Sequence, residues 1–401
     1  MKRYLSADEA AELLGVNKAT LYAYVSRNLI RSEETSVQSR KRRYLAEDVK
    51  KLKERKEYRR NPAQVARDAL HWGTPLLDSA LTLITDTALY YRGQNVLRLA
   101  QTSTLEQVAA LLWTGDSSQW QSLFVHRPDA TSVVKQLDSS LSMVQRVTLA
   151  LTLTEDLAAF ELQPEAVARS GARILALVAL ALTLTPMQVG ENLAQHFVHA
   201  WKSDDPLLTR LVDAALILCA DHELNVSSFT ARVVASADAN PYAVVIAGLA
   251  ALSGFKHGGN TERVDALFRE VGSLEHARRV VVERLRRGER IPGFGHSLYP
   301  NGDPRAAMLL NLLAEVYPNA PEVRFASDLA EQVSELIGHQ PNNDYALVAL
   351  AHAARLPQDA SFALFALGRT VGWIGHAIEQ YNGGTLIRPR ARYTGEPPAD
   401  E

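Results

Sequence analysis

Apolar and polar residues follow a helical period over most of the chain. Beyond residue 100, apolar side chains such as Leu105, Val108, Leu111 and Leu112 recur at the spacing of one helix face. Few later segments carry strand signals, so the bulk of the protein is expected to be mainly α, with Ala and Leu on inward faces that allow close helix packing. The pattern predicts helices over residues 132–153, 164–183, 187–202, 207–220 and 241–252.

Two segments depart from this period. Alternation and β-branched residues over 72–99 predict a small hairpin with a break near Asp86. Residues 291–305 hold three Pro and three Gly, which forbid a long helix or a central strand. We therefore expect an ordered loop that presents His296, followed nine positions later by Arg305.

The N-terminal pattern is that of two short helices. The first, residues 6–15, has Ser6 as N-cap, an acidic first turn and a terminal Gly15. A short turn leads to a second helix over residues 19–27, then to a basic stretch and a basic helix up to Arg60. This head resembles the winged helix-turn-helix of the MerR and excisionase type, and residues 1–60 are expected to form it.

Charge separates this head from the rest of the chain. Residues 1–60 hold sixteen Lys and Arg against nine Asp and Glu, a net charge of +7, so the remainder carries −9 within a total of −2. A basic head suggests DNA as a partner; the alternative is a retained fold that docks on another protein or on its own body. The residues expected to contact DNA are Lys18, Thr20, Tyr22 and Tyr24 on the second helix and Arg40, Lys41, Arg42 and Arg43 on phosphates.

Composition indicates the class of protein and the compartment in which it is expected. The chain has 401 residues, 47% of them hydrophobic and 22% charged, as in soluble globular proteins of two or three domains. Its single cysteine, Cys219, excludes an internal disulfide and fits a reducing cytoplasm. The first residues lack a signal-peptide run, and the longest apolar run, 174–182, is too short to span a bilayer. We expect a cytoplasmic protein with no membrane partner.

Two polar clusters interrupt the apolar helices. Residues 221–227 place His222 and other polar groups between two helices, and residues 253–263 place His257 beside two glycines at the start of a helix. The positive end of a helix disfavours imidazolium, so His257 is expected to be a neutral hydrogen-bond donor. No metal site is expected, since no H-E-x-x-H spacing occurs. Helix packing or surface exposure is expected for His196, His199, His339 and His352.

Three signatures in order resemble the citrate synthase family. They are residues 252–259 (LSGFKHGG), residues 292–305, which run from Pro-Gly-Phe-Gly-His to Asp-Pro-Arg, and residues 341–345 (PNNDY). Further matches lie at residues 91–93, 221–223, 368–373 and 387–390, and coverage runs from about Leu70 to Tyr393. The resemblance implies a large helical domain (61–256 and 353–401) and a small helical domain (257–352) behind the head.

The resemblance implies an acyltransferase that joins acetyl-CoA, or a close acyl-CoA, to oxaloacetate. Asp344 would remove a proton from the acyl methyl group, His257 would stabilise the enolate, and His296 would bind and protonate the keto oxygen. The oxaloacetate ligands would be His222, Arg305, Arg369 and, from the second subunit of a homodimer, Arg388. The residues expected near CoA are Gly293, Phe294, Gly295 and Asn342.

The residue chemistry points the same way. A thioester's α-proton is weakly acidic, so its removal calls for a base and an oxyanion donor acting together. Arginine guanidinium groups bind carboxylates bidentately, which suits a keto-diacid substrate. No resident cofactor is expected. Pro300 replaces a Lys or Arg that the family commonly places near CoA phosphates, which bears on CoA affinity. Two alternatives stay open: a 2-methylcitrate synthase using propionyl-CoA, and a DNA-binding regulator whose body senses a metabolite.

Overall fold

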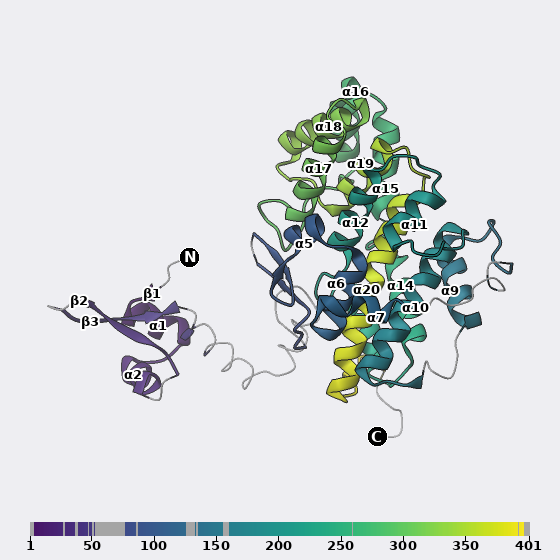
Figure 1. Cartoon of the computed structure of the whole chain (residues 1–401). Helices are drawn as coiled ribbons and strands as arrows, with labels where there is room; N and C mark the ends of the chain where they lie inside the picture. Colours follow the sequence, from purple (N-terminus) through teal and green to yellow (C-terminus); the bar gives the residue numbers. More distant parts are fainter. Residues whose placement is uncertain are drawn as a thin grey trace. The chain divides into compact units, whose positions relative to one another are not determined.

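The computed structural model describes residues 4–26, 29–36, 39–46, 48–49, 52, 77–85, 87–125, 133, 135–154, 160–258, 260–391 and 393–396. By its internal contacts the chain divides into two units, Met1–Asp78 and Ser79–Glu401 (Figure 1). The predicted junction at residues 60–62 and most of the predicted basic helix before it lie outside the described residues. The head boundary at residue 60 therefore stays a prediction.

The head contains the two predicted short helices, α1 (Ala7–Leu14) and α2 (Lys18–Ser26). A capping box starts α1: the Glu9 amide donates to Ser6 Oγ at 3.3 Å, and the Ser6 amide donates to the Glu9 carboxylate at 2.8 Å. Gly15, at a φ of 60°, ends it. The local sequence signals therefore place this helix where the fold has it.

A small antiparallel sheet completes the head. Its strand order is β1-β3-β2, with β1 (Tyr4–Leu5), β3 (Ser39–Leu45) and β2 (Ser32–Ser36). The hairpin of β2 and β3 is the wing that the resemblance implied. A separate core holds the helices on this sheet; it consists of Ala10, Ala11, Leu14, Leu21, Ile30, Tyr44 and Val49.

The body is built around the long helix α20 (Ala360–Gly383), which runs through its middle in yellow (Figure 1). Nearly all of α20 is buried, and it packs against α6, α10, α12, α13, α14 and α19. Glycines allow the helices to pack closely: a Cβ at Gly248 of α14 would lie 2.6 Å from the Trp373 ring of α20.

The remaining helices with their bounds are α5 (Val96–Thr102), α6 (Leu105–Thr114), η1 (Ser117–Gln119), α7 (Trp120–Leu123), α9 (Met143–Thr154), α10 (Pro164–Thr183), α11 (Leu193–Ala200), α12 (Leu208–Cys219), α13 (Val226–Ala235), α14 (Pro241–Leu252), α15 (Asn260–Val271), α16 (Leu274–Arg286), α17 (Pro304–Val316), α18 (Pro321–Ile337) and α19 (Asn343–Ala353).

The mainly helical fold is as predicted, and so are most helix positions. The predicted hairpin is present as β4 (Thr82–Ile84) and β5 (Leu89–Tyr91), and a third strand, β6 (Gln94–Asn95), extends it. The helix predicted over 132–153 is interrupted: Val133 is helical, residues 135–142 form turns and bends, and α9 starts at Met143. The helix predicted over 187–202 is shorter at both ends, since Asn192 caps it and a turn follows Ala200.

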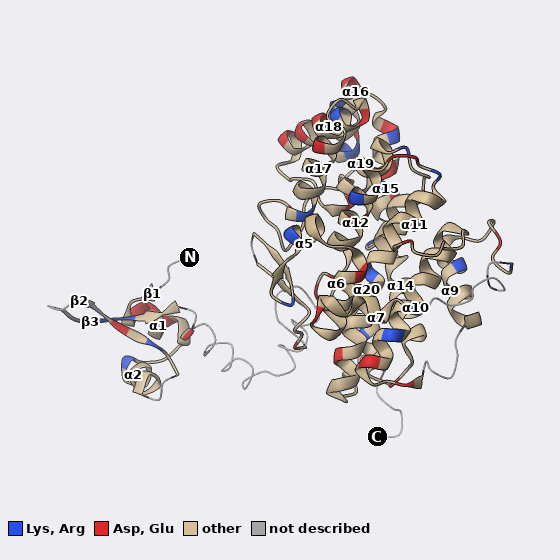
Figure 2. Cartoon of the chain, in the orientation of Figure 1, with Lys and Arg blue, Asp and Glu red and all other residues tan. Residues whose placement is uncertain are grey.

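Helices α15 to α19 pack on one another and lie together at the top of Figure 1. They span the region predicted as the small domain, but the contacts do not divide the body there. Figure 2 shows many charged residues along the ribbons of α16 and α18, whereas the helices through the middle of the body carry few. Among the described helices, α10 alone is long and apolar enough to cross a membrane; 78% of its apolar window is buried inside the protein, so it is a core helix as predicted.

Candidate active site

His222 lies in a buried turn that follows α12. The preceding residue, Asp221, anchors the turn: its carboxylate accepts a hydrogen bond from Thr82 at 2.5 Å and lies 3.1 Å from Nε2 of His376 on α20. A Cβ at Gly372 would sit 2.5 Å from that carboxylate, so only glycine lets α20 approach so closely. The turn is thus held between β4 and the central helix.

Three rings meet above this turn. The ring centroids of His222 and His296 are 5.1 Å apart, and that of the buried Tyr299 is 4.9 Å from that of His296. The Tyr299 hydroxyl lies 3.0 Å from His222 Nε2. Burial lowers the pKa of His222 well below its usual value, with the charge of Arg305 adding to the effect. His222 is therefore neutral at neutral pH.

His296 is held in one tautomer by the loop that carries it. Its Nδ1 accepts a hydrogen bond from the backbone amide of Leu298 at 3.2 Å, so the neutral ring has its hydrogen on Nε2. Burial, with the charge of Arg305, lowers the pKa of His296 to about 4. His296 thus offers a neutral N–H donor at neutral pH.

His257 follows α14 and is positioned by α13 and α20. Its Nε2 lies 2.8 Å from the Ser227 hydroxyl, which also accepts a hydrogen bond from the Trp373 indole at 3.1 Å. Ser227 lies 2.8 Å from the Asn225 side chain as well, so its single hydrogen has two possible acceptors. When that hydrogen points to His257 Nε2, the opposite ring nitrogen carries the N–H. Burial, with the charge of Arg369, lowers the pKa of His257 to about 4.

Asp344 lies in the first turn of α19 and faces α15. Asn342 caps this helix by accepting from the backbone amides of Asp344 and Tyr345 at 3.1 and 3.4 Å. The Asn260 side chain of α15 donates to Asp344 Oδ2 at 2.6 Å. Burial raises the pKa of Asp344, while the Asn260 hydrogen bond works in the opposite direction.

Two buried arginines carry the positive charge of the site, and they differ in their partners. Arg305 forms a bidentate pair with Asp303, at 3.0 and 2.8 Å. Arg369 donates its Nε hydrogen to the Cys219 carbonyl at 2.8 Å and has no carboxylate within ion-pair distance among the described residues. Burial lowers the pKa of Arg369, whose charge also acts on His222, His257 and Asp344.

The predicted CoA-binding segment pairs with the start of α19. The Asn342 amide donates to the Gly293 carbonyl at 2.8 Å, and the Gly295 amide donates to the Gln340 carbonyl at 2.9 Å. The Asn342 side chain also lies 3.3 Å from the Gly295 carbonyl. Gly293 adopts a φ of 85°, where a Cβ would press on Val264. The predicted residues Gly293, Phe294, Gly295 and Asn342 therefore lie together beside Asp344.

The other predicted contacts lie apart from this group. Arg388 is exposed in the segment after α20, and among the described residues it makes no hydrogen bond or ion pair with the other predicted oxaloacetate ligands. In the head, Lys18 pairs with Asp8 at 2.6 Å, and Arg43 pairs with Glu33 at 3.1 Å. The Thr20 hydroxyl donates a hydrogen bond to the Asn17 side chain at 2.9 Å, and Tyr24 packs on the head core. Tyr22 is 51% exposed, and Arg42 is exposed as well. The side chains of Arg40 and Lys41 lie outside the described residues.

Several residues of the site had no role in the sequence-based prediction. Asn260 is one of these residues, and its bond to Asp344 crosses 84 positions of sequence. Ser227 and Trp373 orient His257, and Asp303 holds Arg305 while its Oδ2 accepts the Asn343 amide at 3.1 Å. Ser227 and Asp303 stood inside the polar segments that the sequence singled out, which was the only available signal.

A family comparison decides the identity of the body. The family described as citrate synthase, C-terminal domain, matches residues 69–390. This chain belongs to the citrate synthase family. A helix-turn-helix domain family matches residues 4–57, which confirms the predicted fold of the head.

Individual citrate synthases agree with this assignment. Citrate synthase 2 of Bacillus subtilis is 30% identical over 352 residues, which cover 80% of this chain and 94% of that protein. The crystal structure of citrate synthase from Thermotoga maritima is 28% identical with a TM-score of 0.69 and covers 82% of this chain and 95% of its own. A citrate synthase from Thermoplasma acidophilum, solved with carboxymethyl coenzyme A and oxaloacetate, shares the fold at 24% identity, a TM-score of 0.71 and coverage of 83% and 97%. The body is therefore a citrate synthase-like acyltransferase.

Proposed function

We propose that the body condenses acetyl-CoA with oxaloacetate to give citrate and CoA. The observation that carries this proposal is the convergence of one carboxylate of raised pKa, three histidines of lowered pKa and two buried arginines. Such a set provides a base, neutral hydrogen-bond donors and a binding site for a dianion. It supports acyl transfer to a keto-diacid better than any other reaction class.

In the first step Asp344 takes a proton from the acyl methyl group. Its raised pKa brings a carboxylate closer to the basicity that this proton requires. The charge that develops on the thioester oxygen needs a donor at the same moment. His257 supplies it from Nδ1 when the Ser227 hydroxyl donates to Nε2, and the low pKa keeps the ring neutral.

In the second step the enolate carbon attacks the keto carbon of oxaloacetate. His296 donates its Nε2 hydrogen to the keto oxygen, because the Leu298 amide occupies Nδ1. The negative charge that develops on that oxygen makes it basic enough to take the proton as the carbon–carbon bond forms, and the ring then regains a proton from water. Water then hydrolyses the citryl thioester and releases CoA.

The two arginines bind the oxaloacetate carboxylates. Arg369 is the stronger candidate, since its buried charge has no carboxylate partner among the described residues. The Arg305 guanidinium is oriented by Asp303 and keeps part of its fork for the substrate. The neutral His222 completes the site as a hydrogen-bonding group.

The choice of acyl-CoA is tested by comparing kcat/KM for acetyl-CoA and propionyl-CoA at saturating oxaloacetate. Because one methylene is worth about 1–3 kcal/mol in a pocket, the preference is expected to be about 10- to 200-fold. A preference for acetyl-CoA supports citrate synthesis, and a preference for propionyl-CoA supports the alternative, 2-methylcitrate synthesis. No turnover of either substrate contradicts both.

We also propose a homodimer in which Arg388 completes the partner's site. Its exposure in the single chain and its place after α20 support this role. Coexpression of Arg388→Ala and Asp344→Asn chains tests it. Each mixed dimer then has one site with both native residues, so it is expected to recover activity that neither variant has alone. Absence of recovery in purified mixed dimers contradicts a shared site.

For the head we propose DNA binding through α2 and the wing, in a cytoplasmic enzyme. The helix-turn-helix fold and the exposed Lys18, Tyr22, Arg42 and Arg43 support it. The four phosphate contacts predicted for Arg40, Lys41, Arg42 and Arg43 give an expected slope of about −3.6 for log K against log salt. Fluorescence anisotropy with duplex DNA checks this slope; a slope near zero contradicts it. Salt-dependent DNA binding without turnover would favour the metabolite-sensing regulator.

A further inference from the structure

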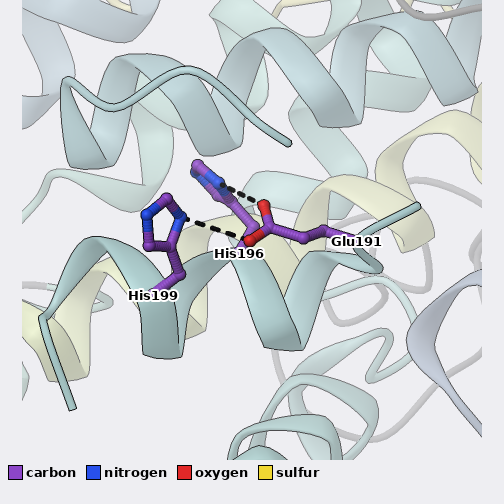
Figure 3. A group of neighbouring side chains, drawn as sticks. All are labelled: Glu191, His196 and His199. Carbon is purple, nitrogen blue, oxygen red and sulfur yellow. Dashed lines mark ion pairs between the residues drawn. The ribbon is translucent and has the colours of Figure 1, made fainter. Parts of the chain in front are cut away.

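Outside the catalytic group, two histidines of α11 and a glutamate just before the helix form a compact cluster. One ligand atom from each of Glu191, His196 and His199 lies within 4.8 Å of the other two. Figure 3 shows the Glu191 carboxylate reaching both rings, with Oε1 3.2 Å from His199 Nδ1 and Oε2 3.8 Å from His196 Nδ1. The two histidines are three positions apart, so they share one face of α11.

Second contacts orient both rings and the carboxylate. The Thr183 hydroxyl donates to the Ala179 carbonyl at 2.9 Å and so accepts from His196 Nε2, 3.0 Å away. In that tautomer the lone pair of His196 is on Nδ1, the nitrogen facing Glu191. The Gln188 backbone amide donates to Glu191 Oε2 at 2.8 Å. The Gln188 side-chain nitrogen lies 2.9 Å from His199 Nε2 and donates to it, so the hydrogen of His199 is on Nδ1, which faces Glu191 Oε1. Metal binding at Nδ1 therefore requires the Gln188 side-chain amide to turn over, so that its oxygen accepts from Nε2. His196 already has its other ring nitrogen held as in metal-binding histidines.

We propose that Glu191, His196 and His199 bind a late first-row divalent cation, with Zn²⁺ as the representative ion. Two imidazoles and one carboxylate form a three-ligand set with a fourth position for water, as in many zinc sites. Bonds of 2.0–2.1 Å in a tetrahedron place ligand atoms about 3.3 Å apart. The two distances from Glu191 to the histidines, 3.2 and 3.8 Å, are close to this value, and all three ligand atoms lie within 4.8 Å of one another. Mg²⁺ and Ca²⁺ prefer oxygen donors and fit poorly.

The cluster combines burial with access. The His196 side chain is fully buried, that of Glu191 is 15% exposed and that of His199 is 40% exposed, so an ion can enter past His199. A bound ion would tie residues 185–192 to the first turns of α11. The role inferred is structural, since none of the three residues belongs to the proposed catalytic group.

Calorimetric titration of the tag-free, chelator-treated full chain with Zn²⁺ tests the site. One Zn²⁺ per chain is expected. Glu191→Gln and His199→Ala each remove a ligand and are expected to weaken binding about 100-fold or more, and Thr183→Val, which removes a second contact, about 10- to 100-fold. The matched control is His276→Ala, an exposed histidine on α16, which is expected to keep the parent affinity.

Two further readouts separate a metal site from an ion pair. Co²⁺ is expected to give the visible bands of a tetrahedral site in the parent and not in His199→Ala. Amide hydrogen exchange over residues 185–192 is expected to slow on Zn²⁺ addition in the parent alone. No binding, or equal binding by the parent, Glu191→Gln and His199→Ala, would overturn the proposal and leave Glu191 as the ion-pair acceptor of the two histidines.

Discussion

The side-chain amide of Asn260 donates a hydrogen bond to Oδ2 of Asp344 across 2.6 Å. One residue stands at the start of α15 and the other in the first turn of α19, and these helices pack together. The bond opposes the effect of burial, which raises the pKa of Asp344. Asn260 therefore both orients the proposed base and sets its protonation.

Replacing Asn260 by Ala is expected to raise the pKa of Asp344 further, because the charged form loses a donor. The base works only when deprotonated, so activity falls as pH drops through this pKa. The acidic limb of the kcat/KM profile should therefore move to higher pH in Asn260→Ala. Asn311→Ala, an exposed change on α17, is the control and should keep the parent profile. An unshifted acidic limb in Asn260→Ala would show that Asn260 does not tune the base.

Ser227→Ala removes the hydroxyl that orients His257 while leaving the rings of His257 and His296 in place. The enolate donor then loses its orientation, so kcat is expected to fall with little change in KM for oxaloacetate. Losing a whole oxyanion donor costs about 10²–10³ in kcat, which sets the upper limit and the value expected for His257→Ala. Steady-state kinetics of Ser227→Ala and His257→Ala checks that the loss of kcat is no larger in Ser227→Ala than in His257→Ala. A loss in Ser227→Ala confined to KM would place Ser227 in substrate binding instead.

Arg369→Met is expected to remove most oxaloacetate binding, since a buried charge-assisted contact typically accounts for about 2–5 kcal/mol. Ligand that binds only the folded state raises the unfolding temperature. Oxaloacetate should therefore raise the Tm of the parent clearly and that of Arg369→Met little. Thermal melts with and without oxaloacetate measure this. Equal shifts in both proteins would mean that Arg369 does not bind the substrate.

Two glycines of α20 offer a matched test of close packing. A Cβ at Gly372 would lie 2.4 Å from the Ala220 carbonyl, whereas a Cβ at Gly383 meets nothing within 4 Å. Gly372→Ala is expected to destabilise the fold by about 1–3 kcal/mol and to disturb the His222 turn. Gly383→Ala is expected to be neutral or to stabilise by up to about 1 kcal/mol. Urea unfolding measures both, and equal free energies of unfolding would contradict the packing described.

Local signals predicted much of the fold. Helix α1 follows from its N-cap Ser6, its acidic first turn and the terminal Gly15, and α12 and α14 follow from apolar runs bounded by polar or glycine residues. The helix predicted over residues 132–153 was wrong over residues 135–142, where turns and bends interrupt it. Periodicity records which residues face the core, not whether the backbone between them is helical.

The proposed catalytic groups could be named from the sequence only because family motifs carry them, and their supporting contacts could not be predicted. Ser227 lies 30 positions from His257, and Asn260 lies 84 positions from Asp344. Only tertiary packing brings such pairs together. His196 and His199 were expected in helix packing or at the surface, since the sequence did not show that the turn before α11 returns Glu191 to them. The roles of all the predicted site residues, Arg388 and the DNA-contact residues included, stay predictions.

The central claim is that Asp344 is the base of an acyl-CoA condensation with oxaloacetate. It is tested by measuring CoA thiol release, with oxaloacetate and acetyl-CoA or propionyl-CoA, by the parent and by Asp344→Asn, which keeps the side-chain shape. The parent should release CoA only when oxaloacetate is present, and Asp344→Asn should be slower by about 10²–10⁴-fold. Release by the parent no faster than by Asp344→Asn would contradict the enzyme assigned here.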